Sequence, residues 1–449
     1  MVDQPEKVEL ATPDLAAQRR AALEELFPDA IADGVLDAAR ICELIDLQVA
    51  RLPDGRERYG LQWAGKQEAI RSLLTPSRAT LVPDPETSIS FDTAENVFIE
   101  GDNLEVLKLL QKAYNDRVKL IYIDPPYNTG NDFVYDDDFS DGLRGYLEYT
   151  GQLDEEGNRT SADAEKAGRK HSRWLNMMYP RLMLARNLLT QDGAIFVSID
   201  DNEVKSLRAV MDQVFGEENF IGQMIWAAGR KNDSKLISES HEYILVYARS
   251  LSSLIESVGK WRTKKDGLEE IYARYEKLLK VHGNDHAAVS DGLKEWFRAL
   301  PEGDPSKRHK HYCNVDARGI YFADNISWPG GGGPKYEVLH PTTGKPVRIP
   351  SRGWLVQEAR MKEWLADDRV HFGADETSVP TVKAYLDDRT TEVPYSVFYV
   401  DGRGATKRLR ALLGGNYFEN PKDETVLKRI IEFASGDGDT VMDFFAGSG

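Results

Sequence analysis

The chain is organised around the stretch Lys119-Leu-Ile-Tyr-Ile-Asp-Pro-Pro-Tyr127, which Asn128-Thr-Gly130 follows. The apolar, β-branched run from Leu120 to Ile123 predicts a short buried strand. Asp124 ends this run, and the two prolines after it can continue neither a helix nor a hydrogen-bonded ladder. A carboxylate is therefore expected at the carboxyl end of a central strand, which is the edge where open α/β sheets bind their ligands.

The residues that follow this strand have the chemistry needed to hold an amino group. The carboxylate of Asp124 accepts hydrogen bonds, and the carbonyl of Pro125 can accept another because Pro126 has no N–H to compete for it. Two acceptors that converge suit the exocyclic amine of a nucleobase, and Tyr127 offers a flat face on which a flipped base can stack. The alternative is a proline-rich turn in which Asp124 is only a cap.

A second motif lies at the far end of the chain, in Asp439-Thr-Val-Met-Asp-Phe-Phe-Ala-Gly-Ser-Gly449. Thr440 to Met442 predicts another buried strand that Asp443 ends. The glycine-rich turn from Phe445 to Gly449 would let the backbone approach a ligand closely. Alone, such a turn is more often purely structural, but its presence together with Asp-Pro-Pro-Tyr favours a binding site.

Composition sets broad limits on what the protein can be. With 449 residues and 41% hydrophobic content, the chain can bury a large core in two or three domains. A net charge of −17 argues against indiscriminate coating of nucleic acid but not against a local basic groove. The two cysteines provide no disulfide framework, and no apolar run is long enough for a signal region or membrane span. We therefore expect a soluble, cytoplasmic protein with no membrane partner.

The order of predicted elements indicates the fold. Strands and helices alternate from Val97 to Phe215, beginning with a strand at Val97–Ile99, which is the signature of a doubly wound α/β sheet. Asp102 precedes a predicted helix at 104–110, and it is equally suited to cap that helix or to bind the adenine amine of a cofactor. We expect a helical N-terminal segment at 1–80 and the catalytic half of the sheet at 81–225. The cofactor half is expected at 401–449.

Between these halves, residues 226–400 break the alternation of strands and helices and predict an inserted α+β domain. Basic residues interleaved with aromatic ones suit contact with phosphates and bases, although each cluster alone is more often a solvated surface. The clusters are Lys260–Lys265, Lys307–His311 and Gly402–Arg410. His309, His311 and Cys313 are unlike a zinc site because no second ligand pair follows at finger-like spacing, so no metal is expected.

Taken together, these segments resemble the modification subunit of Type III restriction-modification systems and other β-group site-specific adenine methyltransferases. In that group the catalytic motif precedes the cofactor loop, a circularly permuted order. The resemblance covers nearly the whole chain and is carried by five segments: Arg58–Lys66, GDNLEVL at Gly101–Leu107, IDPPYNTG at Ile123–Gly130, WLNMMYPRL at Trp174–Leu182, and SIDDNE at Ser198–Glu203.

The resemblance implies transfer of a methyl group from S-adenosylmethionine to the N6 amine of a flipped adenine in double-stranded DNA. It implies catalytic roles for Asp124, Pro125, Pro126 and Tyr127. The cofactor-binding residues it implies are Asp102, Phe418, Asn420, Lys422, Asp443, Phe445, Gly447 and Gly449. It further implies a homodimer, a helicase–nuclease restriction subunit as partner, and residues 226–400 as the target-recognition domain.

Three other functions can be weighed at the level of sequence, and Asp124 argues against the first two. Enzymes that methylate the N4 amine of cytosine more often carry Ser in place of Asp124, and protein-glutamine methyltransferases would show Asn there. A DNA-binding specificity subunit without activity is the third. It is kept open because Gly449 ends the chain inside the cofactor turn. From this ending we expect a fragment that binds S-adenosylmethionine weakly, unless contacts around Asp102, Phe418 and Lys422 suffice.

Overall fold

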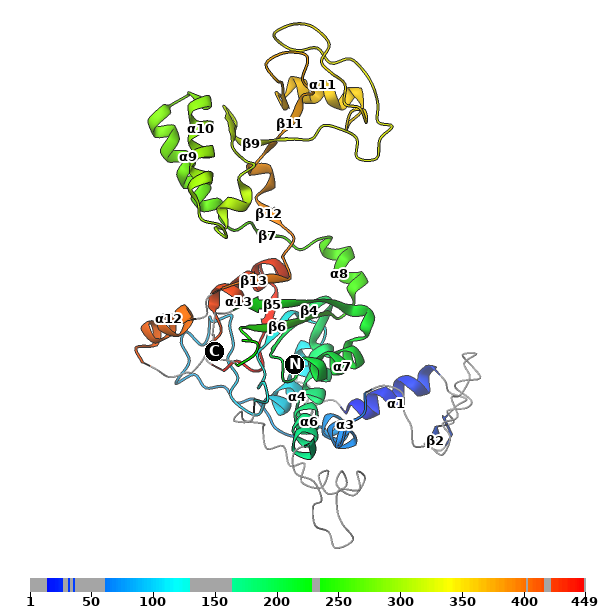
Figure 1. Cartoon of the computed structure of the whole chain (residues 1–449). Helices are drawn as coiled ribbons and strands as arrows, with labels where there is room; N and C mark the ends of the chain where they lie inside the picture. Colours follow the sequence, from blue (N-terminus) through cyan, green and yellow to red (C-terminus); the bar gives the residue numbers. More distant parts are fainter. Residues whose placement is uncertain are drawn as a thin grey trace, which may run out of the picture. The chain divides into compact units, whose positions relative to one another are not determined.

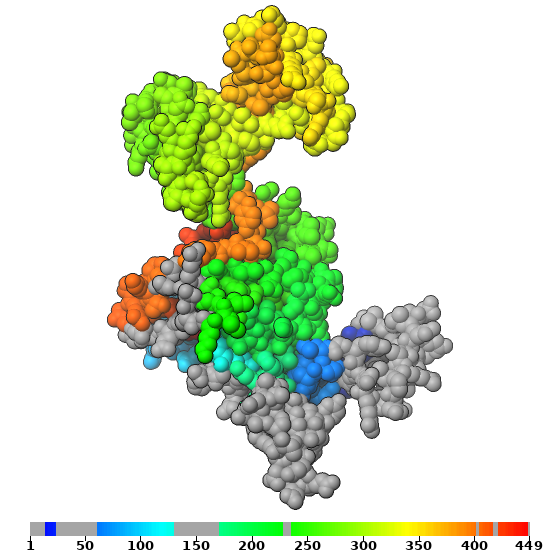
Figure 2. Space-filling model, in the orientation of Figure 1, coloured from blue at the N-terminus to red at the C-terminus, as the bar shows by residue number. Residues whose placement is uncertain are grey.

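A computed structural model describes residues 14–26, 31–32, 35–36, 61–129, 164–227, 235–400, 403–415 and 421–447. The chain divides into two compact units (Figure 1). The first is made of Met1–Trp261 and Tyr395–Gly449, and the second of Arg262–Pro394. Figure 2 shows that segments from the middle and from the end of the chain share the surface of the first unit.

A six-stranded sheet forms the centre of the first unit, in the order β13-β5-β6-β4-β3-β14. Its strands are β3 (Val118–Ile123), β4 (Leu189–Ile199), β5 (Phe220–Ala227), β6 (His241–Ala248), β13 (Val397–Tyr399) and β14 (Thr440–Met442). Neighbouring strands are parallel except where β6 pairs with β4 and β5. The predicted α/β sheet is thus confirmed, as a mixed sheet with one antiparallel strand.

The two strands that carry the sequence motifs lie side by side. β3 and β14 pair in parallel, with Met442 opposite Ile121. Because parallel strands end at the same edge of a sheet, Asp124 and Asp443 emerge next to each other although they are 319 positions apart in the sequence. The sheet topology therefore brings the two predicted motifs together.

Helices bury both faces of this sheet. One face packs against α3 (Lys66–Leu74), α4 (Asn103–Tyr114), α6 (Ala164–Leu188) and α7 (Val204–Phe215). The other packs against α13 (Glu424–Ala434), whose apolar residues Val426, Ile430 and Phe433 recur at helical spacing. Ile121 and Ile123 face the first layer while Leu120 and Tyr122 face the second. This double burial explains the uninterrupted apolar run of β3.

Two predicted elements near the N-terminus are wrong. Val97–Ile99 forms no strand, because β3 already has β4 and β14 on its two sides, and Val97 and Phe98 are 73% and 76% exposed. Within the predicted helical segment at 1–80, the described residues form α1 (Leu15–Leu26) and α3 as expected. Ile31–Ala32 (β1) and Val35–Leu36 (β2) instead pair as antiparallel strands. The other elements of this unit are α8 (Leu251–Val258) and α12 (Arg403–Leu413).

The second unit has its own four-stranded antiparallel sheet, in the order β10-β11-β9-β8. Its elements are β7 (Thr263–Lys264), α9 (Leu268–His282), α10 (His286–Ala299), β8 (Asn314–Asp316), β9 (Gly319–Asp324), α11 (Glu358–Ala366), β10 (Val370–His371), β11 (Thr381–Tyr385) and β12 (Thr391–Glu392). The unit begins at Arg262, later than the predicted start at 226, because β5 and β6 pair within the main sheet.

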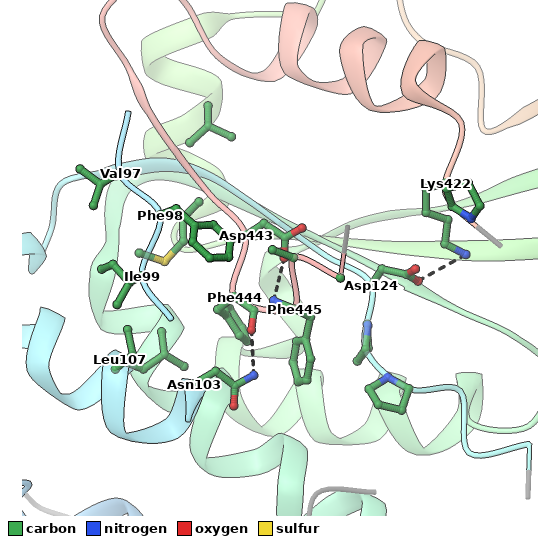
Figure 3. Close-up of a pocket in the computed structure, with 18 of the residues that line it drawn as sticks. Val97, Phe98, Ile99, Asn103, Leu107, Asp124, Lys422, Asp443, Phe444 and Phe445 are labelled. Carbon is green, nitrogen blue, oxygen red and sulfur yellow. Dashed lines mark hydrogen bonds and ion pairs between the residues drawn. The ribbon is translucent and has the colours of Figure 1, made fainter. Parts of the chain in front are cut away.

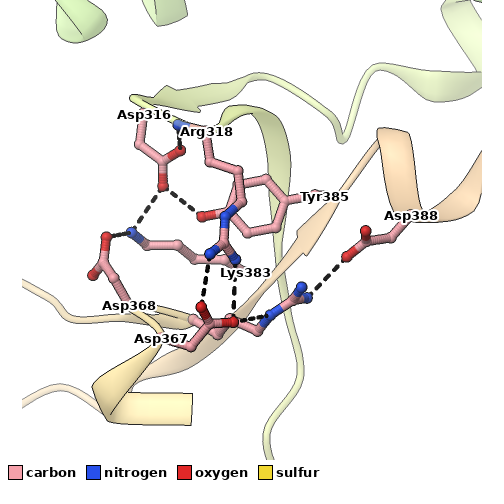
Figure 4. Close-up of polar contacts among 8 residues, drawn as sticks. Asp316, Arg318, Asp367, Asp368, Lys383, Tyr385 and Asp388 are labelled. Carbon is pink, nitrogen blue, oxygen red and sulfur yellow. Dashed lines mark hydrogen bonds and ion pairs between the residues drawn. The ribbon is translucent and has the colours of Figure 1, made fainter. Parts of the chain in front are cut away.

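An ionic network lies within this second unit (Figure 4). The buried Lys383 donates to Asp316 at 2.9 Å and to Asp368 at 2.8 Å. Tyr385 donates to the same oxygen of Asp316 at 2.7 Å. Burial works against ionisation of Asp316, but the hydrogen bonds from Lys383 and Tyr385 outweigh it and lower the pKa of this carboxyl. The network therefore holds β8 and β11 together through charge.

None of the described helices combines the length and the apolar character that crossing a bilayer requires.

Candidate active site

A cavity of about 1750 Å³ opens in the first unit where β3 and β14 end (Figure 3). The two sequence motifs form part of its wall, together with a segment that precedes α4 and residues from β5, β6 and the approach to α13. Residues that line it include Val97–Ile99, Asn103, Asp124–Tyr127, Trp226, Glu242, Lys422 and Asp443–Gly447. The segment predicted as a strand at Val97–Ile99 thus forms an apolar wall of the cavity instead.

Asp124 presents an uncommitted acceptor to this cavity. Its Oδ1 atom is buried and accepts no hydrogen bond from the described residues, although Lys422 Nζ lies 3.3 Å away as an ion-pair partner. Burial raises the pKa of Asp124, and the charge of Glu242 adds to this, while Lys422 opposes it. A partner that donates a hydrogen bond would therefore be bound at this oxygen with a gain in free energy.

Tyr127 is held by two residues that are distant in the sequence. Lys422 Nζ donates to Tyr127 Oη and to Glu242 Oε2, each at 2.5 Å, and Tyr127 Oη donates to Glu242 Oε2 at 3.0 Å. Burial, with the charges of Asp124 and Glu242, raises the pKa of Tyr127 well above its usual value, so the phenol stays neutral. Lys422, predicted to bind the cofactor, therefore contacts the catalytic turn.

Sequence reasoning did not identify Glu242. The available signal was a single acidic residue near the start of an otherwise apolar strand, His241–Ala248.

A tryptophan in α6 holds the proline turn in place. Trp174, fully buried in α6, donates its indole N–H to the carbonyl of Pro126 at 2.6 Å. Pro125 lines the cavity beside Asp124. The turn is therefore anchored at Pro126, next to Pro125 and two residues after Asp124.

The turn after β14 is tied to the helical layer. Asn103 donates to the carbonyl of Phe444 at 2.7 Å (Figure 3), and Arg181 Nε donates to Asn103 Oδ1 at 2.6 Å. Gly447 has φ of +55°, a backbone conformation that residues with a side chain rarely adopt. Asn103 and Arg181 were not predicted as site residues, and Asn103 could have been noticed only as part of the GDN turn.

Asp443 brings a second carboxylate to the cavity. Its Oδ1 atom accepts the backbone N–H of Phe445 at 2.8 Å. The surrounding protein, together with the charge of Asp124, raises the pKa of Asp443 to about 6. The cavity therefore carries two carboxylates whose ionised forms repel each other, which favours a ligand with positive charge.

Asp102 takes the capping role rather than a place in the cavity. Its side chain accepts the backbone N–H of Glu105 at 3.0 Å and lies 3.7 Å from Arg181 Nη2, and it does not line the cavity. The neighbouring Asn103 lines the cavity in its place. Phe418, Asn420 and Gly449 lie outside the described residues, so their predicted cofactor contacts stay predictions.

The predicted absence of a metal site can be examined only in the described ranges. There, no group of three or more His, Cys, Asp and Glu side chains could hold a metal ion. His309 Nε2 instead hydrogen-bonds the carbonyl of Asp266 at 3.0 Å, which ties the turn before β8 to the start of α9.

Residues 118–449 match the sequence model of the DNA methylase family, so the chain belongs to that family. Within it, the chain is similar to Type III restriction-modification Mod subunits. It is 34% identical to the EcoP15I Mod subunit of Escherichia coli over 96% of this chain and 67% of that protein. It is 33% identical to the StyLTI Mod subunit of Salmonella typhimurium over 93% of this chain and 58% of that protein.

A third relative is the EcoPI Mod subunit of Escherichia phage P1, with 31% identity over 96% of this chain and 66% of that protein. The chain thus spans 58% to 67% of the length of these relatives. The solved structure of the PvuII cytosine-N4-specific DNA methyltransferase matches with a TM-score of 0.21 and 12% identity, over 34% of this chain and 49% of that one. A TM-score this low carries no structural argument.

Proposed function

We propose that this protein transfers a methyl group from S-adenosylmethionine to the N6 amine of adenine at a specific site in double-stranded DNA. The observation that carries the proposal is the buried Oδ1 of Asp124, which accepts no hydrogen bond from the described residues and lies in one cavity with Pro125. The similarity to Type III Mod subunits supports the same reaction.

The two acceptors, Asp124 and the Pro125 carbonyl, can make the target amine a better nucleophile. The lone pair of an exocyclic amine is delocalised into the base, so the amine is a poor nucleophile. Hydrogen bonds from its N–H groups to Asp124 and to the Pro125 carbonyl would draw the hydrogens out of the ring plane and localise the lone pair. Tyr127 would stack against the flipped base and repay part of the cost of unstacking, a few kcal/mol. The ion pair with Lys422 lowers the pKa of Asp124 and so opposes the rise that burial causes, which favours the ionised form needed for this role.

The residues around β14 fit the cofactor. S-adenosylmethionine supplies, when bound, an electrophilic methyl group on a positively charged sulfur. The carboxylate of Asp443 offers the negative charge that such a cation requires, and the open turn at Gly447 admits a ligand close to the backbone. Val97–Ile99 offers apolar surface for an aromatic ring. The catalytic turn precedes the cofactor turn along the chain, the circularly permuted order of the β group.

The remaining assignments concern recognition and assembly. The second unit lies between the two sequence segments of the first, which supports a role as an inserted target-recognition domain within the broader predicted range of 226–400. The names of the relatives, which are Mod subunits of Type III restriction-modification enzymes, support a second, restriction subunit as a partner, which the family resemblance implies to be a helicase–nuclease. We also propose a homodimer.

The test is the identity of the methylated base. The full-length protein is incubated with S-adenosylmethionine and unmethylated DNA, and the digested nucleosides are measured by mass spectrometry. We expect N6-methyladenine from the native protein, its loss in Asp124→Ala, and unchanged yield in Asp92→Asn, a control at an exposed turn residue. Losing one preorganised acceptor costs about 2.7–4 kcal/mol of barrier, so the loss should be about 100- to 1000-fold. N4-methylcytosine instead would establish the cytosine alternative, and no methylated base would refute the proposal.

A further inference from the structure

A buried carboxylate lies behind the catalytic turn, outside the cavity. Glu203 is fully buried at the start of α7, where its side chain makes no capping hydrogen bond. Its Oε1 atom accepts a hydrogen bond from Asn128 Nδ2 at 2.5 Å and lies 2.6 Å from His171 Nδ1. Its Oε2 atom is buried too and accepts no hydrogen bond from the described residues. The Glu203 carboxylate therefore binds the segment that contains Asn128 and does not cap its own helix.

Asn128 directly follows the Asp-Pro-Pro-Tyr turn and fixes the path by which the chain leaves it. It is 3% exposed and has φ of +61°, a left-handed conformation that is uncommon for a residue with a side chain. Its amide donates both to Glu203 and to the carbonyl of Lys170, the latter at 3.2 Å. The strained backbone is thus held by side-chain hydrogen bonds to two other segments.

The charge of Glu203 is not needed for packing. Burying a carboxylate is costly unless donors compensate it, and a neutral glutamine could also accept from Asn128. A charged acceptor makes a hydrogen bond roughly twice as strong as a neutral one, which suits a turn that must not move. His171, a second donor to the same oxygen, lies one helical turn before Trp174, which holds Pro126. The turn is therefore held at two residues: α6 and Glu203 bind Asn128, and Trp174 of α6 binds the Pro126 carbonyl.

We propose that Glu203 is a positioning residue for methyl transfer, acting through Asn128 to hold Asp124 and the Pro125 carbonyl where the target amine must bind. The inference rests on the proposed function and adds to it a group that never touches the base. Displacement of a reacting group by about 1 Å can cost about 100-fold in rate, so a modest relaxation of this turn is sufficient to impair catalysis.

The test compares three variants of the full-length protein: Glu203→Gln, Asn128→Gly and the double variant. Glycine adopts positive φ without strain, so Asn128→Gly keeps the backbone path and removes the side-chain hydrogen bonds to Glu203 and to the Lys170 carbonyl. The control is Glu217→Gln, an exposed glutamate beyond the other end of α7. The measurements are kcat, the KM values for DNA and S-adenosylmethionine, cofactor affinity by calorimetry, and the melting temperature.

We expect each single variant to lower kcat by 10- to 100-fold, with both KM values and the cofactor affinity within about threefold of the native protein. Because the two residues act through one hydrogen bond, the double variant should be no slower than the slower single variant. A residue with a merely structural role would instead lower the melting temperature without this split between kcat and KM.

The outcomes separate this inference from the proposed function. Near-native kcat in Asn128→Gly overturns the positioning role whether or not Glu203→Gln folds, and so do losses that multiply in the double variant. A native protein that methylates no base refutes the proposed function and this inference together.

Discussion

Replacing Lys422 with methionine probes the electrostatics of the catalytic turn. The ammonium lies 2.5 Å from Glu242 Oε2 and 3.3 Å from Asp124 Oδ1, so Lys422→Met leaves two carboxylates near each other without their shared cation. Lys428→Met is the matched control, because that lysine is 75% exposed on α13 and lies 3.8 Å from Glu432. Both changes remove one positive charge and keep a linear side chain.

The size of the stability loss in Lys422→Met depends on how far the ion pair is buried. Removing one partner of a fully buried ion pair costs about 3–5 kcal/mol. The side chains here are 13%, 30% and 29% exposed for Lys422, Asp124 and Glu242, so solvent screening reduces the cost and we expect about 2–3 kcal/mol. The exposed control pair should contribute at most about 1 kcal/mol.

The stability that Lys422→Met loses should depend on pH, and the pKa of Asp124 determines in which direction. Burial already raises the pKa of Asp124, and Lys422 is the main influence that opposes this rise, so the pKa in Lys422→Met should lie higher still. A carboxyl whose folded pKa exceeds its unfolded value stabilises the protein below the unfolded pKa, and this stability is lost as the pH rises through the folded pKa. The stability deficit of the variant should therefore be largest at neutral and alkaline pH and shrink toward pH 4.

Urea unfolding of the native protein and both variants between pH 4 and pH 8 measures this deficit, and methyl transfer is followed over the same range. Activity of Lys422→Met should recover as the pH rises, because Asp124 must be ionised to accept a hydrogen bond from the target amine. A deficit equal to that of Lys428→Met, or one that does not change with pH, would refute the assignment of Lys422 to this cluster.

Three further predictions concern the cofactor, the second unit and recognition. Because Asp443 has a pKa of about 6, affinity for the cationic cofactor should fall as the pH drops below 6, and calorimetry should find no such pH step in Asp443→Asn. Lys383→Met leaves Asp316 without its buried cation and should destabilise the second unit by about 3 kcal/mol in urea unfolding, against no measurable change for the exposed Lys277→Met. Exchanging residues 262–394 for those of a relative should change the methylated sequence but not the methylated atom, as sequencing of modified bases would show.

The sequence by itself determined the elements whose residues carry a local pattern. The apolar run at 120–123 predicted β3 because strands buried on both faces need no alternation, and the helix predicted at 104–110 lies within α4. Asp124 and Asp443 could be placed at strand ends because prolines or glycines stop the strands there. These predictions depend only on neighbours in the chain.

The tertiary structure alone decided which of these local features meet. The hydrogen bond between Asn103 and Phe444 spans 341 positions, and the contact of Lys422 with Glu242 spans 180. Val97–Ile99 has the composition of a strand, but the places beside β3 are taken by β4 and β14, and so these residues line the cavity instead. Strand order and long-range contacts depend on how the whole chain packs, and no local pattern of residues contains that information.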